Sequence, residues 1–273
     1  MKKNILIVII GNLLMLSSCI DEGSNTIECA QNLGYITSVN NTVCAATSCG
    51  YVTSPEIQKL KQKECYVFGY TITSYAQNNV YLADRVYHIS EQPLLQTSLV
   101  QETPPVLTEN NIAINNLSIP IFWSTSYMGD RWLFNFSALS KDKSKVTAHF
   151  YYDKNNQIDK EGKNVKEENK VIIDVVFIHS ESTEDNSVAK MRNFSSIGNL
   201  ESLRAFPNFN KVTTDPNGKM YATLLIQFRF HKYISKDKSE ISYLGVWNKV
   251  NSCYERVYYL TEAYFTTNQN NQN

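Results

Sequence analysis

The sequence lacks the short motifs that mark the commonest enzyme sites. It contains no GxSxG nucleophile turn, no P-loop, no GxGxxG dinucleotide loop and no HExxH zinc motif. Its 26 basic and 26 acidic side chains balance, whereas nucleic-acid binding depends on an excess of clustered Lys and Arg. We therefore predict no catalytic residue, no metal site, no cofactor and no nucleic-acid partner.

Glycine is also scarce, at 10 of 273 residues, whereas the sequence has 17 tyrosines and 12 phenylalanines. Aromatic and β-branched residues favour strands. The segment Val171–His179 is apolar on both faces except at Asp174, as expected of a central strand. The composition and pattern predict a mainly β fold, an antiparallel β-sandwich or barrel-like domain with a few short peripheral helices. The other predicted strands, where apolar and polar residues alternate, are 64–74, 80–90, 112–126, 131–139, 145–153 and 219–231, and residues 241–250 are expected to help close the sheet.

Helix signals are confined to a few stretches. Ser54-Pro55-Glu56 supplies a cap, a proline and an acid, and predicts a helix of about two to three turns through Lys63. Residues 183–191 and 196–206 are predicted to form further short helices. Residues 253–267 fit both strand and helix spacing, and a closing strand is preferred.

Residues 1–19 form a separate element. A positive start precedes a short apolar run, Ile5–Leu16, and two serines then lead into Cys19. The run is shorter than the roughly 20 residues of a bilayer-spanning helix, and its layout is that of an export signal. The ending Leu16-Ser17-Ser18-Cys19 resembles the lipobox of bacterial lipoproteins. An ordinary secretory signal cut nearby is the alternative, with Cys19 as a structural cysteine.

The lipobox resemblance implies cleavage just before Cys19 and attachment of acyl chains, such as palmitate, to that residue. It also implies a place in the bacterial cell envelope. Ile20 stands where an aspartate resembles an inner-membrane retention signal, so the outer membrane is favoured. Asp21 and Glu22 are similar to surface-export signals of some bacteria, but two charges make a weak pattern, and the leaflet face stays open.

The chain divides into parts of different character. Residues 1–18 are the signal peptide, and residues 19–63 are a tether and cysteine-rich segment with one short helix. Residues 64–267 form the β-rich domain, in which the proline-containing connection 91–110 leaves room for a subdivision. Residues 268–273, rich in Asn and Gln, are expected to be disordered.

The remaining cysteines indicate disulfides, because an oxidising envelope favours them. Cys29, Cys44, Cys49 and Cys65 are the candidates for two bridges, each contributing roughly 2–4 kcal/mol. Cys253 is expected to stay unpaired, although spacing alone leaves every pairing open. The competing hypothesis is a zinc site formed by the first four cysteines, but the close CxxC pairs typical of such sites are absent.

Other candidate ligand sites depend on the fold. His88, His149, His179 and His231 each lie near a predicted strand and would form a metal or catalytic cluster only if the fold brought them together. The loop Asp153–Asp159 has oxygen ligands at alternating positions, as a calcium loop does. It has isoleucine where a calcium loop needs glycine, so a solvated charged loop is favoured.

These features favour a lipid-anchored envelope protein with a non-catalytic binding or scaffolding role, accessory to an envelope or secretion assembly. Its partners would be the membrane, through Cys19, and an envelope protein or glycan. One alternative is an anchored hydrolase of polysaccharide or peptide, whose carboxylates, such as Asp130, Asp174 and Glu255, would meet only in the fold. Another is a glycan-binding module, which needs coplanar exposed aromatic side chains. The tryptophans available for it are Trp123, Trp132 and Trp247.

Overall fold

The computed structural model describes the chain between residues 26 and 264, with gaps. Contacts divide the chain into unit 1, Met1–Pro93, and unit 2, Leu94–Asn273, which are described separately. Within the described ranges the helical elements are two short 3₁₀ turns, and no helix has the length and apolar character needed to cross a bilayer. The predicted mainly β fold is confirmed. The described ranges are 26–73, 80–106, 111–122, 130–166, 168–180, 186–206, 211–216, 218–235, 238–248 and 257–264.

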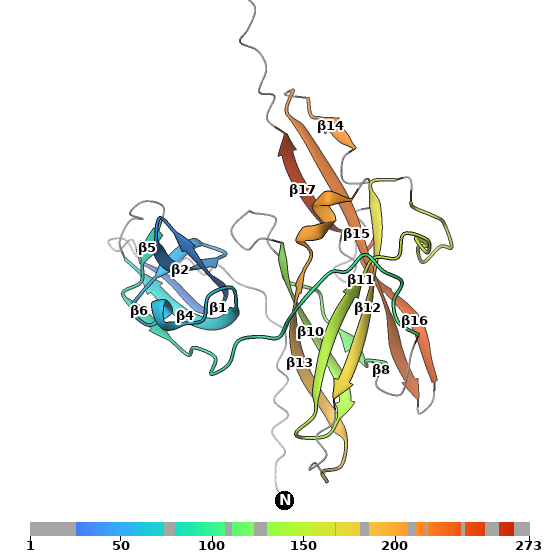
Figure 1. The fold of residues 1–273 in the computed structure, drawn as a ribbon, viewed down its shortest axis with the longest axis horizontal. Coiled ribbons are helices and arrows are strands. Elements are labelled where there is room, and N and C mark those ends of the chain that lie inside the picture. Colours follow the sequence, from blue (N-terminus) through green and yellow to red (C-terminus); the bar gives the residue numbers. More distant parts are fainter. Residues whose placement is uncertain are drawn as a thin grey trace, which may run out of the picture. The chain divides into compact units, whose positions relative to one another are not determined.

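Unit 1 is built on one sheet with the strand order β5-β3-β2-β1-β4-β6 (Figure 1). β1 lies inside this sheet because it pairs antiparallel with β2 on one edge and with β4 on the other. A 3₁₀ turn, η1 (Ile57–Lys59), lies between β3 and β4. The strands are β1 (Ile27–Val39), β2 (Thr42–Thr47), β3 (Gly50–Thr53), β4 (Cys65–Ile72), β5 (Val80–Leu82) and β6 (Arg85–Tyr87).

The first three strands lie where the sequence predicted a tether and a cysteine-rich stretch outside the β domain. The structure places no domain boundary between residues 63 and 64, because β1, which precedes this point in the chain, pairs with β4, which follows it. Small side chains explain the difference: Ala45 and Ala46 on β2 are fully buried without belonging to a long apolar run. The units divide between Pro93 and Leu94, inside the connection 91–110.

The turn η1 begins at Ile57, two residues later than predicted, and ends early. The hydroxyl of Ser54 accepts a hydrogen bond from the Ile57 N–H at 3.2 Å. The predicted continuation to Lys63 is wrong, because Leu60 is already extended. The Lys63 N–H then donates to the carbonyl of Ile36 on β1 at 2.8 Å, which returns the chain to the sheet after one turn.

Residues 80–90, predicted as one strand, form two short ones on opposite edges of the sheet. β5 pairs parallel with β3, whereas β6 pairs antiparallel with β4. Between them the carboxylate of Asp84 accepts hydrogen bonds from the N–H and the hydroxyl of Thr73, both at 2.7 Å.

Unit 2 contains two sheets (Figure 1). One has the order β7-β13-β10-β9. In the other, β11-β12-β15-β14 is extended by β16 and β17 on β15 and by β8 on β12. Most pairs are antiparallel, but β12 and β15 run parallel, as do β7 and β13. The elements are β7 (Gln96–Ser98), β8 (Asn111–Ile112), β9 (Asn116–Leu117), β10 (Arg131–Ser140), β11 (Lys145–Tyr151), β12 (Lys170–Ser180), β13 (Lys190–Asn199), η2 (Glu201–Ala205), β14 (Val212–Thr214), β15 (Met220–Ser235), β16 (Lys238–Leu244) and β17 (Tyr258–Tyr264).

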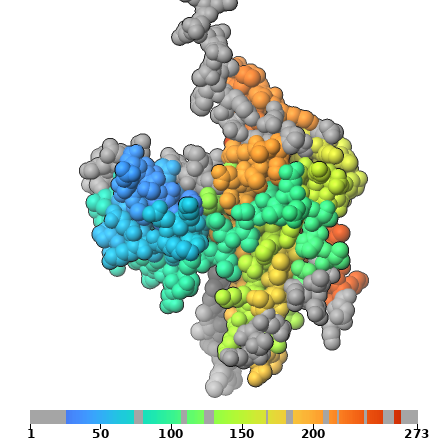
Figure 2. Space-filling model, viewed as in Figure 1, coloured from blue at the N-terminus to red at the C-terminus, as the bar shows by residue number. Residues whose placement is uncertain are grey.

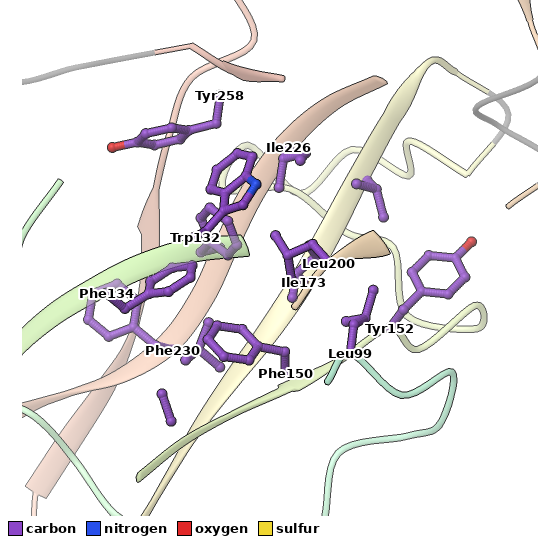
Figure 3. Close-up of a cluster of buried hydrophobic side chains, with 14 of the residues drawn as sticks. Leu99, Trp132, Phe134, Phe150, Tyr152, Ile173, Leu200, Ile226, Phe230 and Tyr258 are labelled. Atoms are coloured by element: carbon purple, nitrogen blue, oxygen red, sulfur yellow. The ribbon is translucent and has the colours of Figure 1, made fainter. Parts of the chain in front are cut away.

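The core of unit 2 consists of alternate side chains from these sheets (Figure 3). Figure 3 shows Trp132 and Phe134 of β10 beside Phe150 of β11 and Ile226 of β15. The rings of Phe134 and Phe150 lie 4.7 Å apart between centroids. The inward sets that alternation predicts are confirmed as buried. They are Trp132, Phe134, Phe136 and Ala138 on β10, and Val146, Ala148, Phe150 and Tyr152 from the β11 segment.

The predicted helix over residues 196–206 is wrong. β13 continues to Asn199, paired with β10, and only η2 follows. Leu200 and Leu203 are buried at the N-cap and within η2, whereas long-range pairing with β10 holds residues 196–199 in a strand. The predicted helix over residues 183–191 is also not found in its described part: residues 186–189 have no regular secondary structure, and residues 190–191 belong to β13. The predicted tail, 268–273, lies outside the described residues.

Candidate functional site

Unit 1 brings together two of the cysteines that the sequence singled out. Cys29 on β1 and Cys49 in the turn between β2 and β3 are 20 positions apart in the chain, and their Sγ atoms lie 3.6 Å apart. Both are free thiols. A bulge between Cys29 and Asn32 shifts the register of β1 against β4. The turn closes at Gly50, whose φ of 115° favours glycine.

A polar network holds the turn against β1 independently of the sulfur contact. The side-chain amide of Asn32 donates to the Ser48 hydroxyl at 2.9 Å and to the Tyr70 hydroxyl at 3.3 Å. The Tyr70 hydroxyl also lies 3.0 Å from Thr47 Oγ1. Asn32, Thr47 and Tyr70 are all buried. Sequence reasoning missed these residues, since their spacing resembles that of ordinary strand positions.

The two thiols of this pair differ in acidity. The hydrogen bond from Cys29 lowers the pKa of Cys49 to about 5, against the opposing effect of burial. The same contact and burial raise the pKa of Cys29. The lowering of the Cys49 pKa agrees with the hydrogen-bond donors around its sulfur. The Ser48 hydroxyl lies 3.8 Å from that sulfur and adds a hydrogen bond to it. Cys49 is therefore the sulfur of the pair that becomes the thiolate.

Cys44 and Cys65, the other two disulfide candidates, are fully buried and lie on opposite sides of β1. Cys44 is opposite Thr37, and Cys65 is opposite Tyr35. Strands flanking a third strand are roughly 10 Å apart, beyond the roughly 7 Å between Cα atoms that a disulfide spans. The structure thus gives no support to a bridge between these two. Cys19 and Cys253 lie outside the described residues.

In unit 2 the apolar strand β12 carries one buried carboxylate, Asp174, directly opposite Arg229 on β15. The Arg229 guanidinium donates to both carboxylate oxygens of Asp174, at 2.6 and 2.8 Å. Burial alone would lower the pKa of Arg229, but the bonds and charge of Asp174 outweigh it and raise the pKa. Together with His231 and Pro104, the pair lines a small cavity of about 180 Å³.

The loop Asp153–Asp159, predicted to be solvated, is instead folded onto the sheet. Gln157 is buried, accepts a hydrogen bond from the Ile172 N–H at 2.8 Å and donates to the Ile172 carbonyl at 3.1 Å. The carboxylate of Asp153 accepts the N–H of Asn155 at 2.8 Å. The carboxylate of Asp159 accepts the indole N–H of Trp247 at 2.9 Å. Protein donors therefore occupy the oxygens that a calcium loop would present.

The histidines lie on separate elements. Burial lowers the pKa of both His149 and His231. His179 lies 3.3 Å from the Ser140 hydroxyl, and His231 lies 3.3 Å from the Ser239 hydroxyl. Across the described ranges no group of three His, Cys, Asp or Glu side chains could hold a metal ion.

The tryptophans that a glycan-binding surface would need occupy different environments. Trp132 is fully buried and stacks on Phe122 with 4.2 Å between ring centroids. Trp247 is partly exposed and lies beneath the Lys170 ammonium. Trp123 and the carboxylate of Glu255 lie outside the described residues. The described tryptophans thus do not form one platform.

Asp130, a carboxylate that the sequence singled out, is also paired with an arginine. Arg204 of η2 donates to its two oxygens at 2.5 and 2.8 Å. Beside η2, a shallow hollow of about 310 Å³ forms where Glu201 and Ser202 meet Leu99. Figure 2 shows the orange atoms of η2 adjoining the green atoms of that earlier segment. The pairing with Arg204 holds η2 to the start of β10.

No family model matches the chain, and no curated protein sequence matches it. Solved structures do match. An uncharacterised protein from Parabacteroides merdae superposes with a TM-score of 0.54 at 10% identity, covering 85% of this chain and 98% of that one. This likeness shows a shared fold.

Two further structures are similar at lower scores. A protein from Bacteroides fragilis, provisionally called a lipoprotein, has a TM-score of 0.43 at 8% identity and covers 88% of this chain and 100% of its own. A protein of unknown function, DUF1344, from Bacteroides vulgatus has a TM-score of 0.47 at 8% identity and covers 79% and 89%. None of the three is described by a catalytic or binding activity.

Proposed function

We propose that this chain is a lipid-anchored protein of the bacterial cell envelope with a non-catalytic binding or scaffolding role, accessory to an envelope assembly. The observation that carries the proposal is the segment Met1–Cys19, with its short apolar run and its ending Leu16-Ser17-Ser18-Cys19. Acyl chains on Cys19 would each bury many CH₂ groups at roughly 0.8 kcal/mol apiece. Several such chains hold a protein firmly to a bilayer, and the outer membrane is favoured.

The position of β1 supports a role close to the membrane surface. β1 begins at Ile27, shortly after Cys19. A fully extended chain spans at most about 3.5 Å per residue, so the linking segment would hold the start of unit 1 within about 30 Å of the anchor. A sheet domain tethered at that distance is suited to contact other components at the same membrane.

The buried carboxylates of unit 2 support a non-catalytic role. Asp130 and Asp174 each accept two hydrogen bonds from an arginine, Arg204 and Arg229 respectively. A general acid or base needs a proton that it can exchange with substrate. Carboxylates fixed in bidentate ion pairs instead join elements of the fold, here η2 to β10 and β12 to β15.

Fractionation of cells that express the full chain tests the proposal. We expect the wild-type protein to stay with the envelope after an alkaline wash and to enter the detergent phase. The Cys19→Ala variant should be released, whereas the Cys29→Ser variant, which also loses one cysteine, should behave as wild type. Release of the wild-type protein by the alkaline wash would contradict the anchor.

Chemical cross-linking in intact cells, followed by purification from solubilised membranes, tests the binding role. We expect the same envelope protein or glycan to be recovered with the wild-type chain in repeated experiments, and to be reduced with Cys19→Ala. Recovery of the chain alone in every repeat would contradict a scaffolding role.

A further inference from the structure

Cys29 and Cys49 differ from the other described cysteines in accessibility as well as in distance. Both are partly exposed, whereas Cys44 and Cys65 have no exposed surface. A disulfide reagent from solution can therefore reach the first two and not the others. The reactive form of a cysteine is its thiolate, and Cys49 is the sulfur from which the proton is more easily lost.

The fold also limits how far the two sulfurs can separate. Asn32 binds the hydroxyl of Ser48, the neighbour of Cys49, at 2.9 Å. Thr47, two positions before Cys49, accepts the Cys49 N–H at 3.2 Å and donates to the Gly50 carbonyl at 2.9 Å. The β2–β3 turn is thus fixed on one side by β1 and on the other by its own backbone bonds.

We propose that Cys29 and Cys49 form an intramolecular disulfide, which joins the first half of β1 to the β2–β3 turn. A disulfide has about 2.05 Å between sulfurs, so closing it from the 3.6 Å contact needs only a small movement of the turn. The inference stands on the geometry of unit 1 and does not depend on the lipid anchor. It selects one pairing from those that the sequence left open.

The chemistry is an exchange with a small-molecule or protein disulfide. The Cys49 thiolate attacks one sulfur of that disulfide, forms a mixed disulfide and releases the other sulfur as a thiolate. Cys29 then gives up its proton and attacks Cys49 Sγ, which displaces the second thiol of the reagent. In total the two cysteines are oxidised, and the reagent disulfide is reduced to two thiols.

Peptide mapping of the full chain, purified in detergent and equilibrated with oxidised glutathione, tests the proposal. No Lys or Arg lies between Lys3 and Lys59, so trypsin leaves Cys29, Cys44 and Cys49 on one peptide. Chymotrypsin cuts after Tyr35 and separates Cys29 from the other two. We expect the Cys29 peptide to be linked to the peptide that carries Cys49 and to be released by a reducing agent.

Matched variants identify the second sulfur of the bridge. Cys44→Ser should keep the linked peptide, whereas Cys49→Ser should lose it. Persistence of the link in Cys49→Ser would show that Cys44 is the partner and would overturn the proposal. The wild-type map gives an answer that needs no variant: full alkylation of Cys29 after equilibration with oxidised glutathione would also overturn it.

Discussion

At the residue scale, the contact between two sulfurs changes the chemistry of both. A hydrogen bond to a thiolate stabilises the charged form, and burial opposes it. For Cys49 the hydrogen bond dominates and brings the pKa to about 5. The pair can therefore carry a thiolate at neutral pH, where an ordinary cysteine with a pKa of about 8.5 is mostly protonated.

We expect the reduced protein to show this shift in its alkylation by iodoacetamide. Because the thiolate is the reacting form, the rate at Cys49 should rise with pH to a plateau, with its midpoint near the pKa of about 5. Cys29→Ala removes the hydrogen-bond donor and should move the midpoint up toward about 8.5. Residue-resolved mass spectrometry across a pH series measures both midpoints, and an unshifted midpoint in the wild type would refute the assignment.

The buried ion pair of unit 2 is the second effect at this scale. Asp174 and Arg229 have side chains that are only 10% and 9% exposed. Removing one partner of such a pair leaves an unpaired buried charge and costs roughly 3–5 kcal/mol. Asp174→Ala should therefore lower the free energy of unfolding by about that amount in denaturant titrations.

An exposed pair supplies the control for Asp174→Ala. Asp142 and Lys190 have side chains that are 50% and 62% exposed, and such pairs contribute about 0–1 kcal/mol. Asp142→Ala should therefore change stability little. If Asp174→Ala lowers the free energy of unfolding no more than Asp142→Ala does, the stabilising role of the Asp174–Arg229 ion pair is contradicted.

At the element scale, the two sheets of unit 2 approach each other closely beside β13. A Cβ atom on Gly198 would lie 2.8 Å from two ring atoms of Phe150 and 3.0 Å from the ring of Phe134. These rings belong to β11 and β10, so glycine allows β13 to pack next to both strands. The absence of a side chain is thus what fixes the spacing here.

Gly198→Ala should destabilise the protein by about 1–3 kcal/mol, the usual cost of overpacking a core. The loss should be smaller in a Phe150→Leu background, since the smaller side chain makes room for the added methyl group. Thermal unfolding of the four proteins in this double-mutant cycle measures the coupling. Additive losses would show that contact with Phe150 is not the cause.

Strands whose alternation has one apolar face could be predicted from the sequence. β10 and β15 are examples, because each places a continuous set of large side chains in the core. β13 could not, because its first half is largely exposed and its buried part includes Ser196 and Gly198. Its strand conformation depends on pairing with β10, a contact that no local pattern reveals.

Long-range contacts also limit what could be predicted of the candidate site. The sequence indicated the cysteines as a group and Asp174 as a polar residue in an apolar strand. It could not indicate that Cys29 meets Cys49, because the bulge in β1 and the network around Tyr70 decide that contact. Nor could it pair Asp174 with Arg229, 55 positions away in the chain.

At the scale of the whole molecule, two β units follow a segment that resembles a lipoprotein signal. The fold is shared with a Parabacteroides protein at 10% identity, so it tolerates almost complete replacement of its residues. Core size and alternation, rather than particular side chains, therefore define the architecture. A fold shared at this identity does not by itself indicate a function.

The measurement that tests the central claim most directly is the chemical identity of the N-terminal residue of the mature protein. Cells grown with an alkyne-labelled fatty acid should yield a chain that carries the label, and mass spectrometry should locate acyl groups on Cys19. Cys19→Ala should carry no label and should leave the membrane. A mature wild-type chain that begins elsewhere, with an unmodified Cys19 thiol, would contradict the lipid anchor.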